Sequence, residues 1–106
     1  MNADTIYKIL LSRPGIYGLY GDRGTRYVGS SSSLLRRYTQ HQRSLQRNQH
    51  KNTILQAAYN GGEQFTLIPI EQFAENTPLW FIAERERYWI INADGVNTPN
   101  NVRLRL

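Results

Sequence analysis

The stretch from Gly15 to Gly29, GIYGLYGDRGTRYVG, decides the fold of this chain. Its two ends, residues 15–20 and 26–29, are rich in tyrosine and branched aliphatic residues, which favour β-strands. Between them, residues 21–24 (GDRG) have the composition of a turn. The pattern predicts an antiparallel β-hairpin in which Tyr20 lies opposite Arg26.

Two tyrosines come together in this hairpin. Side chains alternate along a strand, so Tyr17 and Tyr27 share one face as diagonal neighbours. Gly29 lies opposite Tyr17 and should leave open space beside one phenol. Ordinary cross-strand packing is the simpler interpretation of the two rings, and a functional surface is the alternative.

Outward from the hairpin, helical and extended patterns alternate. Apolar residues at helical spacing, with N-cap candidates in the serine run 30–33, mark the helices. Pro69 cannot donate a hydrogen bond to a neighbouring strand, so its strand is expected at a sheet edge. The expected elements are helices at 3–12, 34–48, 52–59 and 78–93, a third strand at 65–73 and a loop at 94–106.

Length and composition set further limits. The 106 residues suffice for a single domain, 1–106, with one compact core. The absence of cysteine excludes disulfide scaffolds, cysteine-ligated zinc and cysteine nucleophiles. No apolar run approaches the roughly 18 residues of a membrane span, and the N-terminus lacks the layout of a signal peptide. We therefore expect an intracellular protein, in the cytoplasm or nucleoid, that does not associate with a membrane.

The charge is positive and unevenly distributed. Thirteen Lys and Arg against eight Asp and Glu give a net charge of +5, and residues 23–62 contain no acidic residue. Arginine's planar guanidinium suits phosphate, so this excess predicts a nucleic-acid partner, and an ordinary basic domain is the alternative. The residues expected to contact DNA are Arg26, Arg36, Arg43, Arg47, His50 and Lys51. For His50, a cap at the junction of two helices is an equally good interpretation.

Glu86 is the most unusual residue of the predicted last helix. It falls in the middle of the apolar stripe formed by Leu79, Ile82, Ala83, Trp89 and Ile90. An isolated ionised carboxylate is costly in apolar surroundings. Three interpretations stay open: a metal ligand at the floor of a cleft, a buried ion pair with an arginine such as Arg37, and a bend that exposes Glu86 to water.

Arg37 and His41 form a second candidate pair. They lie one helical turn apart at the edge of a core stripe, where they can present a guanidinium and an imidazole to one ligand. An exposed arginine beside a histidine at the core margin is the simpler interpretation. That core stripe is expected to comprise Leu34, Leu35, Tyr38 and Leu45. Trp80 and Trp89 both look like core residues.

The order of these residues resembles a known family. Gly15-Ile16-Tyr17, a gap of nine residues and Tyr27-Val28-Gly29 are similar to the paired motif that names the GIY-YIG nucleases. Arg37 lies ten residues after Tyr27, and His41, Glu86 and Asn101 follow in the family's order. The resemblance runs from about residue 15 to 101, and it is closest to the catalytic domains of phage intron-encoded homing endonucleases.

This resemblance implies a fold and a set of roles. The fold is α+β, a small three-stranded antiparallel sheet flanked by helices, with residues 1–14 as an additional N-terminal helix. Tyr17 would activate the attacking water as a general base, supported by Tyr27. Alternatively, Tyr17 would relay a proton that His41 takes up. Arg37 would bind the scissile phosphate.

The resemblance also implies a metal. Glu86 would hold one divalent ion per site, Mg²⁺ or Mn²⁺, and Asn101 would support the end of the site. YVG stands here for YIG, and the residue before Asn101 is not the aromatic residue that the family often has.

We therefore expect a metal-dependent endonuclease that hydrolyses DNA phosphodiester bonds with low sequence specificity on its own. A separate DNA-recognition domain or a partner protein would supply specificity. The alternatives are a non-catalytic nucleic-acid-binding module of the same fold, a nuclease specific for branched or flapped DNA, and a structural basic protein with no nucleic-acid role.

Overall fold

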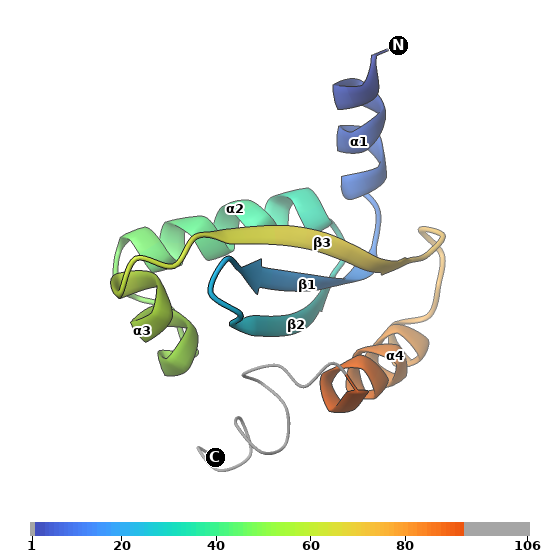
Figure 1. Cartoon of the computed structure of the whole chain (residues 1–106). Coiled ribbons are helices and arrows are strands. Elements are labelled where there is room, and N and C mark those ends of the chain that lie inside the picture. Colours follow the sequence, from blue (N-terminus) through green and yellow to red (C-terminus); the bar gives the residue numbers. More distant parts are fainter. Residues whose placement is uncertain (1, 93–106) are drawn as a thin grey trace.

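The structure is a computed structural model that describes residues 2–92 and has an α+β architecture (Figure 1). Within that range three antiparallel strands form one sheet in the order β2-β1-β3, and four helices surround it. The elements are α1 (Ala3–Leu11), β1 (Gly15–Gly21), β2 (Arg26–Ser31), α2 (Leu34–Gln46), α3 (Thr53–Asn60), β3 (Phe65–Gln72) and α4 (Leu79–Asn92). The predicted fold class is confirmed.

The β1–β2 hairpin has the predicted register. Tyr20 pairs with Arg26, and Tyr17 pairs with Gly29. Gly24 in the turn has a φ of 96°, a conformation that glycine adopts without strain. The prediction of open space beside Gly29 is wrong, because a Cβ at Gly29 would lie 2.5 Å from the Tyr17 hydroxyl oxygen. The phenol itself covers this glycine.

β3 pairs with the other side of β1 and is an edge strand, as Pro69 predicted. The helix boundaries lie within two residues of their predicted positions. Ser33 and Asn52 are the N-caps of α2 and α3, and each side-chain oxygen accepts a hydrogen bond from a backbone N–H three residues later. Local sequence therefore fixes where these helices begin.

Each face of the sheet has its own apolar core. Alternation along β1 sends Tyr17 and Leu19 to the face covered by α2 and α3, and Ile16 to the face covered by α4 (Figure 1). The buried residues of the first core are Leu11, Tyr17, Leu19, Leu34, Leu45, Leu55, Phe65 and Leu67. The second core comprises Ile16, Val28 and Ile82, with Ile70, Phe73, Trp89 and Ile90 packed against it.

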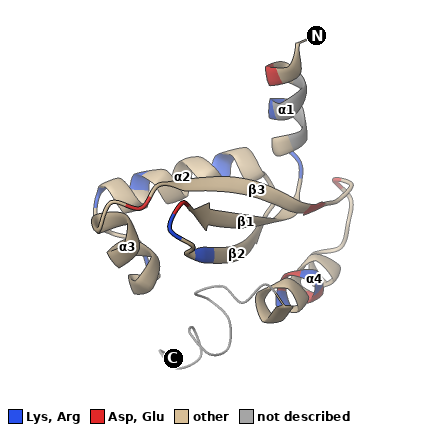
Figure 2. Ribbon diagram, viewed as in Figure 1, with Lys and Arg blue, Asp and Glu red and all other residues tan. Residues whose placement is uncertain are grey.

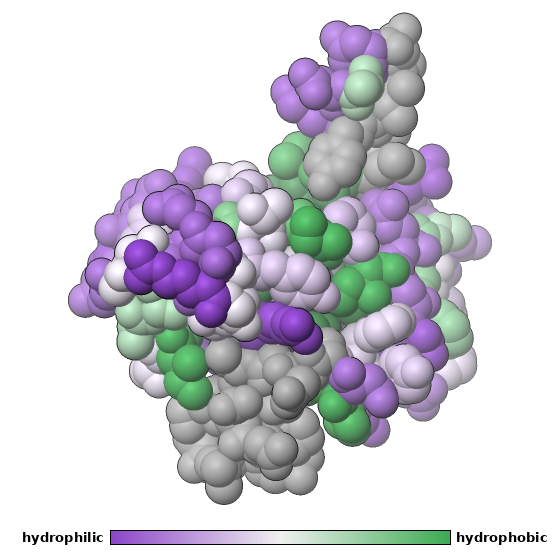
Figure 3. Space-filling view, in the orientation of Figure 1, coloured by the Kyte–Doolittle hydropathy of each residue, from purple (hydrophilic) through white to green (hydrophobic). Residues whose placement is uncertain are grey.

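α4 buries less of its surface than the helical wheel predicted. Ile82 is buried and Trp89 is half-buried, whereas Leu79 and Trp80 are 81% and 64% exposed and Ala83 is also exposed. The predicted burial of these last three residues is therefore wrong. A sheet of three short strands is too narrow to cover a 14-residue helix along its whole length. Apolar side chains accordingly reach the surface over α4 (Figure 3).

Glu71 of β3 ties α4 to the sheet. Its Oε1 accepts hydrogen bonds from Arg85 Nε at 2.8 Å, from Arg85 Nη2 at 2.5 Å and from Trp89 Nε1 at 2.5 Å. Within residues 2–92, Arg85 and Glu71 form the one ion pair found. This anchor holds one end of α4 against the β3 edge.

A second carboxylate fastens the hairpin turn. Glu63 is 3% exposed and accepts hydrogen bonds from the backbone N–H groups of Arg23 and Thr25 at 3.0 and 2.9 Å, and from the Thr25 hydroxyl at 2.6 Å. Burial by itself raises the pKa of Glu63, but these three bonds outweigh it and hold the pKa below its ordinary value.

Glu63→Ala is expected to lower the free energy of unfolding by about 2–4 kcal/mol at neutral pH, since it leaves two backbone N–H groups without their acceptor. The contribution is complete above the ordinary pKa of 4.5 and is lost as the pH falls through the lower folded-state pKa. Urea unfolding at neutral and acidic pH measures it. Glu75→Ala, at an exposed carboxylate, is the control, and an equal loss in both variants would contradict the assignment.

Candidate active site

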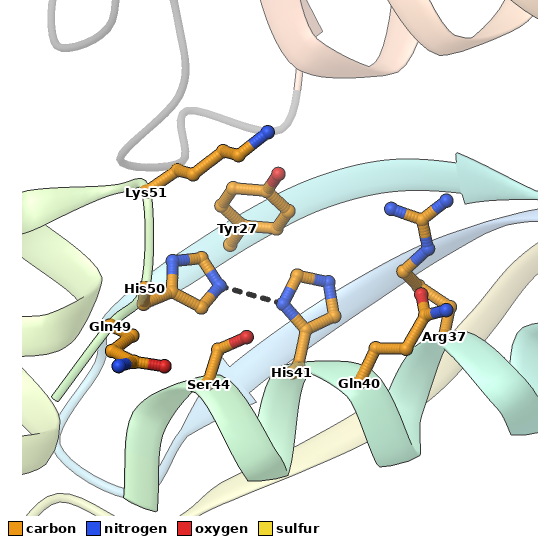
Figure 4. Close-up of a pocket in the computed structure, with 8 residues that line it drawn as sticks. All are labelled: Tyr27, Arg37, Gln40, His41, Ser44, Gln49, His50 and Lys51. Atoms are coloured by element: carbon orange, nitrogen blue, oxygen red, sulfur yellow. Dashed lines mark hydrogen bonds between the residues drawn. The ribbon is translucent and has the colours of Figure 1, made fainter. Parts of the chain in front are cut away.

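A cavity of about 390 Å³ lies beside β2, on the side of the sheet that α2 covers (Figure 4). Because β2 is an edge strand, the cavity lies at the rim of the sheet. Its walls come from β2, from α2 and from the segment that leads into α3. The lining residues are Tyr27, Arg37, Gln40, His41, Ser44, Gln49, His50 and Lys51.

Three of these side chains are directed away from α2. In Figure 4 the Tyr27 hydroxyl, the Arg37 guanidinium and the Lys51 amine all point toward the same side of the cavity. Arg37 and Lys51 are exposed, so both cations are accessible to a ligand. A guanidinium, an ammonium and a hydroxyl on one wall provide hydrogen-bond donors and positive charge for an anion.

A chain of hydrogen bonds runs through the wall behind this cavity. The Tyr17 hydroxyl lies 2.5 Å from His41 Nε2, and His41 Nδ1 lies 2.7 Å from His50 Nε2. The backbone N–H of Asn52 donates to His50 Nδ1 at 3.0 Å. Tyr17 is 1% exposed and does not line the cavity, whereas Tyr27 does. The phenol that faces a ligand is therefore Tyr27, with Tyr17 behind it.

Burial and charge control the ionisation of these groups. Burial, together with Tyr27 and Glu86, raises the pKa of Tyr17 far above its ordinary value, and Arg37 opposes the rise. Burial and Glu86 also raise the pKa of Tyr27. Burial, His50 and Arg37 lower the pKa of His41 to about 4. The resting site at neutral pH thus contains neutral phenols and a neutral His41.

His41 belongs to the core of α2 and not to its edge. It is 6% exposed, while Leu35, expected in the core, is 37% exposed. The face of α2 that meets the sheet therefore follows Leu34, Tyr38, His41 and Leu45, at spacings of four, three and four residues. The imidazole of His41 therefore points inward to Tyr17, whereas Leu35, which the hydrophobic pattern placed in the core, lies at the surface.

The low pKa of His41 gives stability a defined pH dependence. An unfolded histidine with a pKa of 6.5 binds a proton before folded His41 does, so stability is complete above 6.5 and falls between 6.5 and about 4. The expected loss over that window is about 3 kcal/mol. Thermal unfolding as a function of pH measures it, and His41→Gln should remove most of the slope. An unchanged slope in the variant would contradict the assignment.

Glu86 projects from α4 on the other side of the β2 edge. Its Oε1 accepts a hydrogen bond from Ser30 Oγ at 2.5 Å, and the carboxylate lines a second cavity of about 360 Å³ that also contains Ser31 and Ser32. Its charge acts on both Tyr17 and Tyr27, so Glu86 and the first cavity share one electrostatic environment. The structure therefore places Arg37, His41 and both tyrosines on the α2 side of the sheet and Glu86 on the α4 side, next to the same edge strand.

The three interpretations of Glu86 now separate. Glu86 is half-buried, so its carboxylate is partly exposed to water, as the third interpretation expected. Within residues 2–92 it forms no ion pair with Arg37 or with any other arginine. A single carboxylate with a hydroxyl beside it suits Mg²⁺, which usually keeps several waters and takes one or two carboxylates together with substrate phosphate. The residues present fit a divalent ion held by Glu86.

The residues expected to contact DNA divide into two groups. Arg26, Arg36, Arg43, Arg47 and Lys51 are exposed, and α2 carries basic residues without any acidic one (Figure 2). His50 differs from this group because it is half-buried and both of its ring nitrogens are hydrogen-bonded within the protein. His50 also lines the first cavity, so its role as a DNA contact stays a prediction, although both ring nitrogens already have partners in the protein.

Some site residues escaped the sequence interpretation. Ser30, which donates to Glu86, enters the sequence analysis only as a member of the serine run 30–33, and Gln40, Ser44 and Gln49 carry no signal apart from their spacing along α2 and its end. Asn101, the sixth catalytic candidate, lies outside the described residues.

Comparison with known proteins agrees with this geometry. A family model described as the GIY-YIG catalytic domain matches residues 13–94, more than three quarters of the chain, and this span contains both tyrosine motifs, α2 and Glu86. Neither the curated proteins nor the solved structures contain a significant match. None of the helices within residues 2–92 has the length and apolar character that a bilayer crossing requires. With this match, the chain belongs to the GIY-YIG family of nucleases.

Proposed function

We propose that this protein is a divalent-metal-dependent endonuclease that hydrolyses DNA phosphodiester bonds with low sequence specificity of its own. The observation that carries the proposal is that one edge strand, β2, has a cation-lined cavity with the phenol–imidazole group on one side and the Glu86 carboxylate on the other. Phosphodiester hydrolysis by this route needs positive charge next to the phosphoryl oxygens, a proton acceptor and a carboxylate for a metal ion.

Arg37 would bind the scissile phosphate. Its guanidinium is exposed, faces the cavity beside Tyr27 and makes no ion pair with Glu86 that would have to be broken. Negative charge grows on the non-bridging oxygens as water attacks, so a fixed guanidinium stabilises the transition state more than the ground state. Lys51, from the far end of the same cavity, would neutralise a neighbouring phosphate of the strand.

The phenol–imidazole group would handle the proton of the attacking water. Tyr27 faces the cavity, and Tyr17 lies behind it in contact with His41. The raised pKa of both phenols makes the phenolate scarce in the resting protein. Arg37 lowers the pKa of both, so phosphate bound by Arg37 and the ionisation of a phenol are electrostatically linked.

Glu86 would hold Mg²⁺ or Mn²⁺, one ion per site. A divalent ion bound there supplies Lewis acidity and stabilises the leaving oxygen. Ser30 fixes the carboxylate from one side through its hydroxyl, which leaves Oε2 of Glu86 as the oxygen available to a cation. The serine-lined cavity beside it gives room for the waters that Mg²⁺ retains.

Nicking of supercoiled plasmid DNA tests the proposal. We expect nicked and then linear DNA with Mg²⁺ or Mn²⁺ and none with EDTA, and restoration when the metal is added back. Absence of cutting with every divalent ion tried, together with salt-dependent DNA binding, would favour the non-catalytic binding module. If the protein neither cuts DNA nor binds it in a salt-dependent way, the result would favour a structural basic protein.

Cleavage of other DNA substrates tests substrate choice. The spacing of Tyr17, Tyr27, Arg37, His41 and Glu86 supports a likeness to the catalytic domains of phage intron-encoded homing endonucleases, in which DNA recognition depends on a separate domain or partner. Cleavage-site mapping on random-sequence duplex should then give many sites. Preferential cutting of branched or flapped DNA over plain duplex would identify a structure-specific nuclease.

A further inference from the structure

The hydrogen-bond chain Asn52–His50–His41–Tyr17 can run in only one direction, because it begins at a backbone amide. The Asn52 N–H can act only as a donor, and it donates to His50 Nδ1. His50 Nδ1 must therefore carry a lone pair and no proton. A neutral imidazole has one N–H, so the proton of His50 lies on Nε2.

The same reasoning applies to the next two hydrogen bonds. His50 Nε2 lies 2.7 Å from His41 Nδ1, so a proton on His50 Nε2 makes His41 Nδ1 the acceptor. His41 must then carry its own proton on Nε2, 2.5 Å from the Tyr17 oxygen. In this direction His41 donates to the phenol oxygen. The opposite direction would place an N–H of His50 against the N–H of Asn52.

The surroundings of His41 and His50 favour the neutral imidazole, on which this assignment of protons depends. Burial lowers the pKa of both histidines, and the nearby Arg37 lowers the pKa of His41 further, to about 4. At neutral pH each ring therefore carries a single proton, whose position the hydrogen bonds decide.

We infer that the backbone N–H of Asn52 fixes the direction of this chain, which makes His41 a hydrogen-bond donor to Tyr17 and makes His50 a positioning residue of the site. This inference rests on the proposed nuclease function for its catalytic meaning. His41 has no free lone pair while the chain is intact, so it is not the general base. Its N–H instead stabilises negative charge on the Tyr17 oxygen, and the proton-accepting role falls to a phenol.

Nitrogen NMR of the DNA-free protein tests the direction without any variant. With ¹⁵N-labelled protein at neutral pH, both His41 and His50 should show the chemical shifts of an imidazole protonated at Nε2. A proton on Nδ1 of His41 would overturn the inference.

Two variants at one position test the role of the amide. Asn52→Pro removes the N–H and should move His41 toward the Nδ1-protonated form or a mixture of forms. Asn52→Ala keeps the N–H while also losing the helix cap, so it should retain the wild-type tautomers at a similar loss of stability. Wild-type tautomers in both folded variants would overturn the inference.

Kinetics of His50 variants test the positioning role. His50→Leu should lower kcat by about 10²-fold with little change in KM. The substitution leaves the position of the His41 proton unfixed, but it does not remove a group that we assign to DNA binding. His50→Gln should recover much of the rate, since its amide can donate to His41 Nδ1. A rise in KM alone would instead assign His50 to DNA binding. If the wild type does not cut DNA, the proposed function fails, whereas the NMR result still decides the direction of the chain.

Discussion

Arg37→Ala is expected to lower kcat/KM for plasmid nicking by about 10²–10³-fold, the usual effect of removing one fixed donor from a transition-state oxygen. The side chain is exposed, so the free energy of unfolding should change by no more than about 0.5 kcal/mol. The loss has two sources. The phosphate loses its guanidinium, and both phenols lose the cation that favours their ionisation.

Arg36→Ala is the matched control for this prediction. Arg36 is the preceding residue of α2, does not line the cavity that contains Arg37, and donates through its guanidinium to Ser32 Oγ at 2.8 Å. Its removal should weaken DNA binding modestly and uniformly across sequences, with a shallower dependence of affinity on salt. Arg37→Lys should restore only part of the rate, because an ammonium cannot form the planar bidentate pair. Equal losses in Arg36→Ala and Arg37→Ala would contradict the assignment.

Glu86→Gln is expected to have the largest effect, a loss of metal-dependent nicking of about 10³-fold or more. The amide oxygen can still accept the Ser30 hydrogen bond, so the packing of α4 should persist. Without its charge, the group no longer binds Mg²⁺ effectively, because Mg²⁺ takes carboxylate in preference to neutral ligands. Nicking rates across a series of Mg²⁺ and Mn²⁺ concentrations measure the effect.

Glu86→Gln should also change the pKa of the tyrosines, and this reports the loss of charge independently of any change in packing. Glu86 raises the pKa of both Tyr17 and Tyr27, so the substitution should lower the pKa of each phenol, and ultraviolet titration can follow this at Tyr27, which lines the cavity. Glu84→Gln makes the same chemical change at an exposed position of α4 and should leave both readouts near wild type. Nicking by Glu86→Gln at the wild-type rate would reject Glu86 as the metal ligand.

The hairpin could be predicted in detail because two local signals agree there. The turn composition at 21–24 fixes where the chain reverses, and the period-two alternation fixes which side chains share a face. Tyr17 opposite Gly29 follows from those two facts alone. The same reasoning holds for the caps at Ser33 and Asn52, where a short polar side chain precedes a helix.

The orientation of the helices could not be predicted in the same way. A helical wheel shows which residues share a face but not how much of that face the sheet covers, so Leu79 and Trp80 were placed in a core that does not extend to them. A histidine inside an apolar stripe is ambiguous on the same grounds. His41 is buried because Tyr17 and His50 satisfy its two ring nitrogens, and those partners lie 24 and 9 residues away.

The role of His50 was hidden for another reason. A histidine in a basic segment resembles a phosphate contact, and nothing in its neighbours in the sequence shows that a backbone amide two residues later engages its Nδ1. That contact depends on the path of the chain between α2 and α3, which includes Asn48 at a φ of 56°. Asparagine tolerates this conformation, but the residue type alone does not show where the chain then leads.

The groups of the proposed active site are divided between the two cores. The phenols and imidazoles belong to the core beneath α2, whereas Glu86 is carried by α4, which packs on the smaller core. If the proposed function holds, a change that loosens α4 alone is expected to weaken cutting more than DNA binding, because the exposed basic residues lie mainly on α2.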